Sequence, residues 1–103
     1  MFITPTGYEC AKSIKEKLPP EDLYLQLAEE AAELSQAANK MARKLNDNNP
    51  TPKSEKDIYN NVVEEYTDVV LVASTILEME PDELIGNYKL YRWNKRLEEK
   101  ENE

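Results

Sequence analysis

The chain has 103 residues, with no histidine, one cysteine, two glycines and one phenylalanine. The absence of histidine excludes imidazole acid–base catalysis, histidine-activated nucleophiles and histidine-bound zinc. Because Cys10 is alone, no disulfide can form within the chain, and we expect a reducing, cytoplasmic compartment. Few glycines together with 33% charged residues argue against both a β-sandwich and a disordered chain.

Long apolar runs are also missing. No run approaches the roughly 20 residues that a membrane span needs, and residues 1–9 lack the layout of a signal peptide. Acidic residues outnumber basic ones by 21 to 13, which gives a formal net charge of −8. Such a surface repels phosphate backbones, so we expect no nucleic-acid partner, and the lack of a span predicts no membrane partner. The same acidic excess suits a protein that binds cations.

What the chain does contain favours helix, since Ala, Leu, Glu, Lys and Gln dominate its middle. Its length fits one all-α domain over residues 1–103. Helix-breaking residues divide the chain into four predicted helices, near residues 7–18, 21–45, 54–78 and 81–99. Ser54 is the expected N-cap of the third helix, and the apolar-free end from residue 98 to 103 is expected to fray. Short connections favour an antiparallel helical bundle.

The two central helices repeat one pattern. Residues 29–34 and 64–69 both read acid, acid, two other residues, acid, apolar residue. A shift of 35 positions aligns these acids pairwise: Glu29 with Glu64, Glu30 with Glu65, and Glu33 with Asp68. Each of these helices has a stripe of apolar residues along one side. Glu30 and Glu65 fall on the margin of the stripe, and Glu33 and Asp68 fall on the same margin one turn further along. If the two helices pack together along their stripes, four carboxylates converge at one edge of the seam between them.

Four ionised carboxylates at a partly buried edge repel one another, so either some take up protons or a multivalent cation lies between them. An all-oxygen ligand set without His or Cys points to a hard ion, Mg²⁺ or Mn²⁺. Glu29 and Glu64 point further from the seam and suit exposure to solvent or positioning of a water. The alternative interpretation is an ordinary solvated acidic face, because Glu-rich helical surfaces are common.

A basic cluster follows in the last predicted helix, at Lys89, Arg92, Lys95 and Arg96. Cations in the C-terminal half of a helix interact favourably with its dipole, which explains them without any ligand. The functional alternative is that Lys89 and Arg92, three residues apart on one face, hold phosphate oxygens.

Together these residues resemble the MazG-like all-α nucleoside triphosphate pyrophosphohydrolases. The resemblance covers residues 25–96 and consists of an ordered set of motifs: Glu30-x-x-Glu33, Glu65-x-x-Asp68 and Asn87-x-Lys89-x-x-Arg92. These motifs do not separate MazG-like enzymes from the related dimeric dUTPases, dCTPases and phosphoribosyl-ATP pyrophosphohydrolases.

The resemblance implies Mg²⁺-dependent (or Mn²⁺-dependent) hydrolysis of a (deoxy)nucleoside triphosphate to a monophosphate and pyrophosphate. It assigns the metal ligands as Glu30, Glu33, Glu65 and Asp68, and the phosphate-binding residues as Asn87, Lys89 and Arg92. Three acids remain candidates for the general base: Glu29, Glu30 and Glu64. The resemblance also implies a homodimer or homotetramer, which would cover a second apolar flank of the third helix.

The chain departs from the family pattern in two places. The spacing between the two acidic motifs is a little longer than usual, and the loop around residues 46–52 accounts for it. Some members carry a further acid one turn before the first motif, where this chain has Gln26. Two rival hypotheses therefore stay open: a non-catalytic helical interaction protein with a solvated acidic face, and a regulator that binds metal without turnover.

Overall fold

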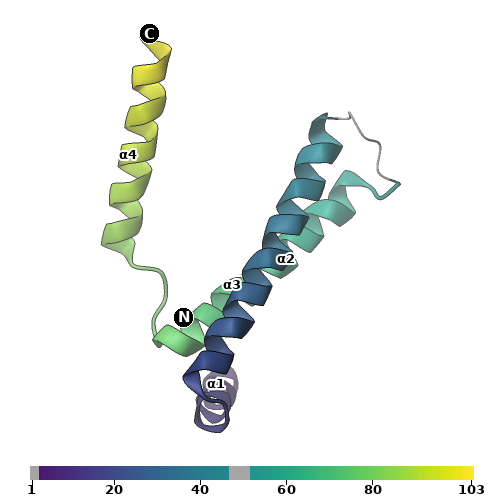
Figure 1. The fold of residues 1–103 in the computed structure, drawn as a ribbon, viewed down its shortest axis with the longest axis vertical. Helices are drawn as coiled ribbons and strands as arrows, with labels where there is room; N and C mark the ends of the chain where they lie inside the picture. The colour runs from purple at the N-terminus through teal and green to yellow at the C-terminus, as the bar shows by residue number, and fades with distance from the viewer. Residues whose placement is uncertain (1–2, 47–51) are drawn as a thin grey trace.

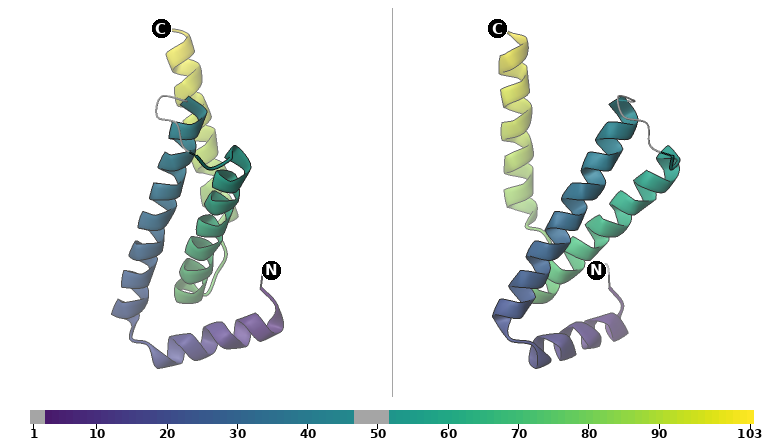
Figure 2. Two further views of the ribbon diagram at one scale, coloured as in Figure 1. Left: turned by 90° about the vertical axis from the view of Figure 1, so that its right-hand side faces the viewer. Right: turned by 45° about the vertical axis from the view of Figure 1, so that its right-hand side comes forward.

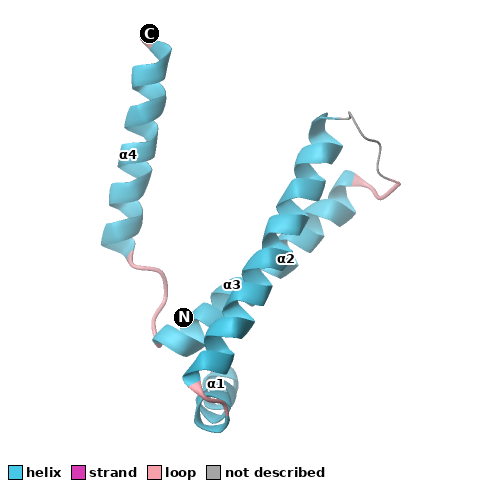
Figure 3. Cartoon of the chain, viewed as in Figure 1, coloured by secondary structure: helices cyan, strands magenta, loops and turns pink. Residues whose placement is uncertain are grey.

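The computed structural model describes residues 3–46 and 52–103, and this part of the chain is all-helical (Figure 3). Its four helices, in chain order, are α1 Pro5–Lys17, α2 Pro20–Asn46, α3 Glu55–Leu77 and α4 Glu83–Glu101. The predicted all-α class and the order of four helices are confirmed. Most of the predicted loop between the second and third helices lies outside the described residues. None of the described helices is both long enough and apolar enough to cross a membrane.

The centre of the molecule is an antiparallel pair formed by α2 and α3 (Figure 1). The hydroxyl of Ser54 accepts a hydrogen bond from the backbone N–H of Asp57 at 3.1 Å, which confirms the predicted N-cap. The buried side chains are Leu23 and Ala37 of α2 and Ile58 of α3. The seam between these two helices is therefore the only place where the described chain has a core, and that core is small.

Helix α1 crosses the end of this pair, as the left panel of Figure 2 shows. It begins two residues earlier than predicted, because Thr4 caps it by accepting a hydrogen bond from the N–H of Gly7 and Pro5 occupies the first turn. The Lys15 ammonium reaches across to α3. It donates to the carbonyl oxygen of Ile76 at 3.0 Å and to Glu78 Oε1 at 2.7 Å. Lys15 thus fastens α1 to the C-terminal end of α3.

Helix α4 lies apart from the other three helices (Figure 1 and the right panel of Figure 2). Asp82 caps its N-terminus by accepting from the N–H of Ile85 at 2.9 Å. In the described chain the main helix–helix packing joins α3 to α2 and, less extensively, to α1. A single chain is thus an antiparallel helix pair with α1 across one end, and α4 does not close a four-helix bundle.

Residues 98–103 were expected to fray, but α4 continues to Glu101. Asn94 Nδ2 donates to Glu98 Oε1 at 3.2 Å, a pair four residues apart that supports the last turns. The N–H of Asn102 then bonds back to the carbonyls of Glu99 and Lys100, and the charge of Lys100 suits the negative end of the dipole.

The attachment of α1 to α3 predicts a pH-dependent difference in stability. The hydrogen bond from Lys15, and then its charge, hold the pKa of Glu78 below the ordinary value of 4.5. A lowered pKa means that the ion pair stabilises the fold above pH 4.5, and that this contribution disappears as the pH falls through the lowered value. Glu78→Gln should therefore have a lower thermal midpoint than wild type at pH 7, and the gap should close as the pH falls from 4.5 through the lowered pKa of Glu78.

Gln keeps the shape of Glu at a position with a left-handed φ of 57°, so backbone strain is matched in the two proteins. Glu99→Gln, at an exposed acid of α4, controls for the loss of one negative charge. A gap that is unchanged from pH 7 down to the lowest pH at which the protein still folds would contradict the role given to the ion pair.

Candidate metal centre

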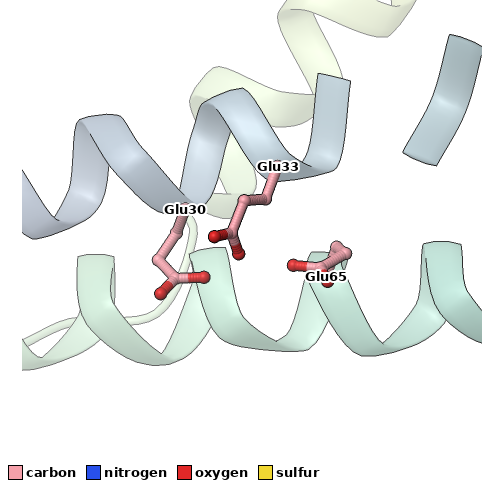
Figure 4. A group of neighbouring side chains, drawn as sticks. All are labelled: Glu30, Glu33 and Glu65. Carbon is pink, nitrogen blue, oxygen red and sulfur yellow. The ribbon is translucent and has the colours of Figure 1, made fainter. Parts of the chain in front are cut away.

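Three acids from the repeated motifs meet between α2 and α3. Glu30, Glu33 and Glu65 each offer a carboxylate oxygen, and these oxygens all lie within 4.8 Å of one another. Figure 4 shows Glu30 and Glu33 projecting from α2 and Glu65 from α3, with the three carboxylates directed into the space between the helices. The expected convergence of acids across the seam is present for these three, which we call the acidic trio.

The antiparallel pairing explains this meeting. Glu30 and Glu33 are one turn apart on α2, so they lie on one face of that helix. Glu30 and Glu65 are partly buried at the margin of the seam, whereas Glu33 is exposed. The same packing that buries apolar side chains along the two stripes therefore brings three like charges together.

Two oxygens of the trio are buried without any partner. Glu30 Oε2 and Glu65 Oε2 have no hydrogen-bond donor within the described residues, although solvent does not reach them. The other oxygen of Glu30 accepts a hydrogen bond from Gln26 Nε2 at 2.8 Å. Buried polar oxygens are almost always hydrogen-bonded or bound to a metal, because desolvation without a partner is unfavourable. Two unpartnered buried oxygens in a group of three neighbouring carboxylates fit the ligand set of a divalent cation.

The electrostatics of Glu33 agree with this geometry. The negative charge of Glu30 raises the pKa of Glu33 above 4.5, followed by partial desolvation and by the charge and hydrogen bond of Glu65. The charge of Glu29 adds a smaller contribution in the same direction. The trio thus resists holding all three negative charges, and either a proton or a cation relieves it.

Other acids of the predicted set lie around the trio. Asp68 is partly buried one turn beyond Glu65 on α3, but its carboxylate is not among the oxygens within 4.8 Å of one another. Its side chain is one methylene shorter than that of Glu, which reduces its reach across the seam. Glu29 and Glu64 are exposed, as their positions away from the stripes predicted. The structure therefore brings together three of the four predicted ligands.

The predicted phosphate-binding residues are elsewhere. Asn87, Lys89 and Arg92 are exposed on α4, which lies apart from the helix pair that carries the trio. Lys89, Arg92, Trp93 and Arg96 line a hollow of about 320 Å³. Arg92 also lies over the ring of Tyr88, 5.7 Å from its centroid. Arg96 belongs to the basic cluster predicted from the sequence, and the spacing of Trp93 and Arg96 from Lys89, four and seven positions, places all of them on one side of the helix.

A larger hollow, of about 830 Å³, lies between α1 and the C-terminal half of α3. Its lining includes Tyr8 and Ile14 from α1 and Leu71 and Thr75 from α3. This volume falls in the range of small-molecule sites, but its wall has none of the acidic trio. The crossing of α1 over α3, which no local sequence pattern encodes, forms this hollow.

Comparison of the chain with protein-family models, with curated proteins and with solved structures returned no match. The interpretation of the acidic trio therefore depends on its own geometry and electrostatics. Both fit a site for a hard divalent cation, and a shared proton would relieve the same repulsion.

The trio predicts opposite effects of one substitution with and without metal. In the presence of a chelator, Glu33→Gln should unfold at a higher temperature than wild type, because one repulsive charge has been removed. With Mg²⁺ at 100 times its Kd, binding should stabilise the wild type by about 2.7 kcal/mol, whereas the variant should gain less. Differential scanning calorimetry in chelator and in a Mg²⁺ series measures both effects.

Glu29→Gln is the matched control, since it removes a neighbouring exposed charge that adds only a small part of the repulsion. Equal stabilisation of wild type and Glu33→Gln by Mg²⁺, or a clear loss of stability of Glu33→Gln in chelator, would contradict the metal centre.

Proposed function

We propose that this protein is a Mg²⁺-dependent nucleoside triphosphate pyrophosphohydrolase, which cleaves a (deoxy)nucleoside triphosphate to the monophosphate and pyrophosphate. The observation that supports it most is the acidic trio, whose carboxylates each place an oxygen within 4.8 Å of the others. Two oxygens of the trio, Glu30 Oε2 and Glu65 Oε2, are also buried with no hydrogen-bond donor in the described residues. The order of the motifs along the chain, acids on two helices and then cations on the last helix, supports the same reaction.

The type of ligand connects the site to phosphate chemistry. Carboxylates alone suit Mg²⁺, or Mn²⁺ in its place, and protein-bound Mg²⁺ usually keeps several waters and binds substrate phosphates. When bound, the ion would supply charge neutralisation for the triphosphate and a more acidic water. In this proposal Glu30, Glu33 and Glu65 hold the ion, and Asp68 completes the ligand set from the next turn of α3.

The general base belongs to the acids that border the trio. Glu29 and Glu64 are exposed beside it, whereas Glu30 is itself a member of the trio and is partly buried. A general base must reach the proton of the attacking water, either directly or through one further water. We therefore favour Glu29 or Glu64 over Glu30 for accepting this proton.

The substrate phosphates need cations, and Asn87, Lys89 and Arg92 are proposed to bind them. Arg can bind two phosphate oxygens with its planar fork, and Lys acts as a point charge. Because α4 lies apart from the trio in a single chain, we propose that the active form is a homodimer or a homotetramer.

A non-catalytic interaction protein is the second candidate, because α4 exposes large apolar side chains over most of its length. One assay separates the two functions. Purified protein is incubated with Mg²⁺ and a panel of canonical and modified nucleoside triphosphates, and pyrophosphate is measured. The enzyme should release pyrophosphate from at least one of them and should stop when Mg²⁺ is chelated. Absence of release across the panel would refute the proposed activity.

Removing metal ligands should abolish this activity without unfolding the helices. Loss of a ligand carboxylate should remove several kcal/mol of transition-state stabilisation, so Glu65→Gln and Asp68→Asn should fall below about 1% of the wild-type rate. Circular dichroism checks that helicity is intact, and Glu99→Gln is the control. Near-normal turnover by Asp68→Asn would remove Asp68 from the ligand set and leave the trio as the metal site.

Arg92→Ala should separate phosphate binding from metal binding. The variant should bind Mg²⁺ as wild type does, because Arg92 is on a different helix from the trio, whereas its affinity for a non-hydrolysable triphosphate should fall about tenfold or more, as expected for a charged hydrogen-bond donor. Isothermal titration calorimetry with each ligand measures both. Equal losses for Mg²⁺ and for the triphosphate would show that Arg92 has another role.

A further inference from the structure

The short connection between α3 and α4 contains a backbone conformation that its sequence does not favour. Glu78, the C-cap of α3, has φ 57° and ψ 35°, which is left-handed, and it is the only residue with a positive φ within residues 3–46 and 52–103. Helices often end in this conformation, but the residue there is usually glycine, because a β-carbon disfavours it. A glutamate at this position therefore needs a compensating interaction.

Lys15 of α1 supplies that interaction. Its ammonium donates to Glu78 Oε1 at 2.7 Å and to the carbonyl oxygen of Ile76 at 3.0 Å. The backbone N–H of Glu78 donates to the carbonyl oxygen of Ser74 at 2.8 Å. The last carbonyls of a helix have no partner within it, so one ammonium both satisfies such a carbonyl and binds the side chain of the left-handed residue. These bonds tie the end of α3 and Glu78 to one point on α1.

The rest of the connection has little freedom. Only residues 78–82 separate α3 from α4. Pro81 fixes its own φ and restricts Glu80 to extended conformations. Asp82 is held as the N-cap of α4, because its side chain accepts a hydrogen bond from the N–H of Ile85 at 2.9 Å. The conformation of Glu78 is therefore a main determinant of the direction in which α4 leaves α3.

Packing does not fix this direction in a single chain. Helix α4 lies apart from the helix pair, and the main helix–helix contacts of the described chain join α3 to α2 and to α1 (Figure 1 and the right panel of Figure 2). A small rotation at the junction is amplified along α4, because each residue of a helix adds about 1.5 Å. Arg92 lies ten residues beyond Asp82, so a rotation of about 20° would move it by about 5 Å.

We propose that Lys15 is a positioning residue for α4. By binding Glu78 and the carbonyl of Ile76 together, it holds the junction in its left-handed conformation and thereby fixes the angle between α3 and α4. This role does not depend on any activity of the protein. Its consequence for a substrate rests on the proposed function, because Lys15 then acts on the triphosphate only through the direction of Lys89 and Arg92 on α4.

Distances between two spin labels measure this angle without any assay of activity. Labels on Lys56→Cys and Glu99→Cys, in a Cys10→Ser background, occupy exposed positions near the far ends of α3 and α4, so their separation reports the angle. Re-equilibration with an excess of unlabelled protein removes distances between copies. Pulsed electron paramagnetic resonance should give a narrow distance distribution in this labelled parent. Lys15→Met should shift its mean by about 5 Å or more, or at least double its width.

Lys12→Met is the matched control, since it removes the same charge from α1 less than one turn earlier, and the distribution should not change. Glu78→Met should act as Lys15→Met does, and combining the two should add nothing, because both remove one contact. If circular dichroism shows that Lys15→Met unfolds, Glu78→Met decides, because it leaves Lys15 bound to the carbonyl of Ile76. A broad distribution in the parent, an unchanged one in the folded variants, or an equal change in Lys12→Met would overturn the proposal.

Kinetics test the consequence for the substrate. Lys15→Met should raise the KM for a nucleoside triphosphate at least fivefold, because the cations of α4 are displaced, and should leave the Kd for Mg²⁺ as in wild type. General destabilisation would not separate these two ligands. Lys12→Met should change neither value. An unchanged KM in Lys15→Met, or equal losses for both ligands, would overturn this consequence. If wild type releases no pyrophosphate at all, the proposed function fails, and the label distances alone decide the role of Lys15.

Discussion

The packing of α2 against α3 determines the other properties of this protein. The two helices bury apolar residues along one seam, and the same contact places Glu30, Glu33 and Glu65 within 4.8 Å of one another. Hydrophobic burial favours the pairing, whereas repulsion between the carboxylates opposes it. A cation at this point turns the opposing interaction into an attractive one, so occupancy of the site and stability of the helix pair are thermodynamically linked.

The helix pair alone is an incomplete fold. Only three apolar side chains are buried in the described chain, and the large apolar side chains of α4 are exposed. The burial of apolar surface that stabilises this chain by itself is therefore concentrated between α2 and α3. If the active form is the proposed oligomer, its stability depends on the concentration of protomers.

Much of the helical architecture was predictable from local patterns. Ser54 and Asp57 marked the start of α3, because an N-cap depends on residues within one turn. The meeting of Glu30 with Glu65 was predictable because a shared register of acids and apolar stripes fixes which faces pack. The start of α1 at Pro5 was missed because Thr4 was not considered as a cap. The end of α4 was placed too early because the Asn94–Glu98 hydrogen bond supports turns without apolar residues.

The position of α4 depends on contacts that no pattern within one chain specifies. Likewise, the exclusion of Asp68 from the trio depends on the length of one side chain. The sequence pattern predicts which helix face a residue lies on, but not how far its side chain reaches. Gln26 gives a last example. Its amide donates to one oxygen of Glu30, and the second oxygen of that carboxylate is buried with no donor in the described residues. This asymmetry favours binding of an ion through the second oxygen of Glu30, and a Mg²⁺ ion held by single oxygens would keep the rest of its octahedral shell for exchangeable waters and a chelating substrate.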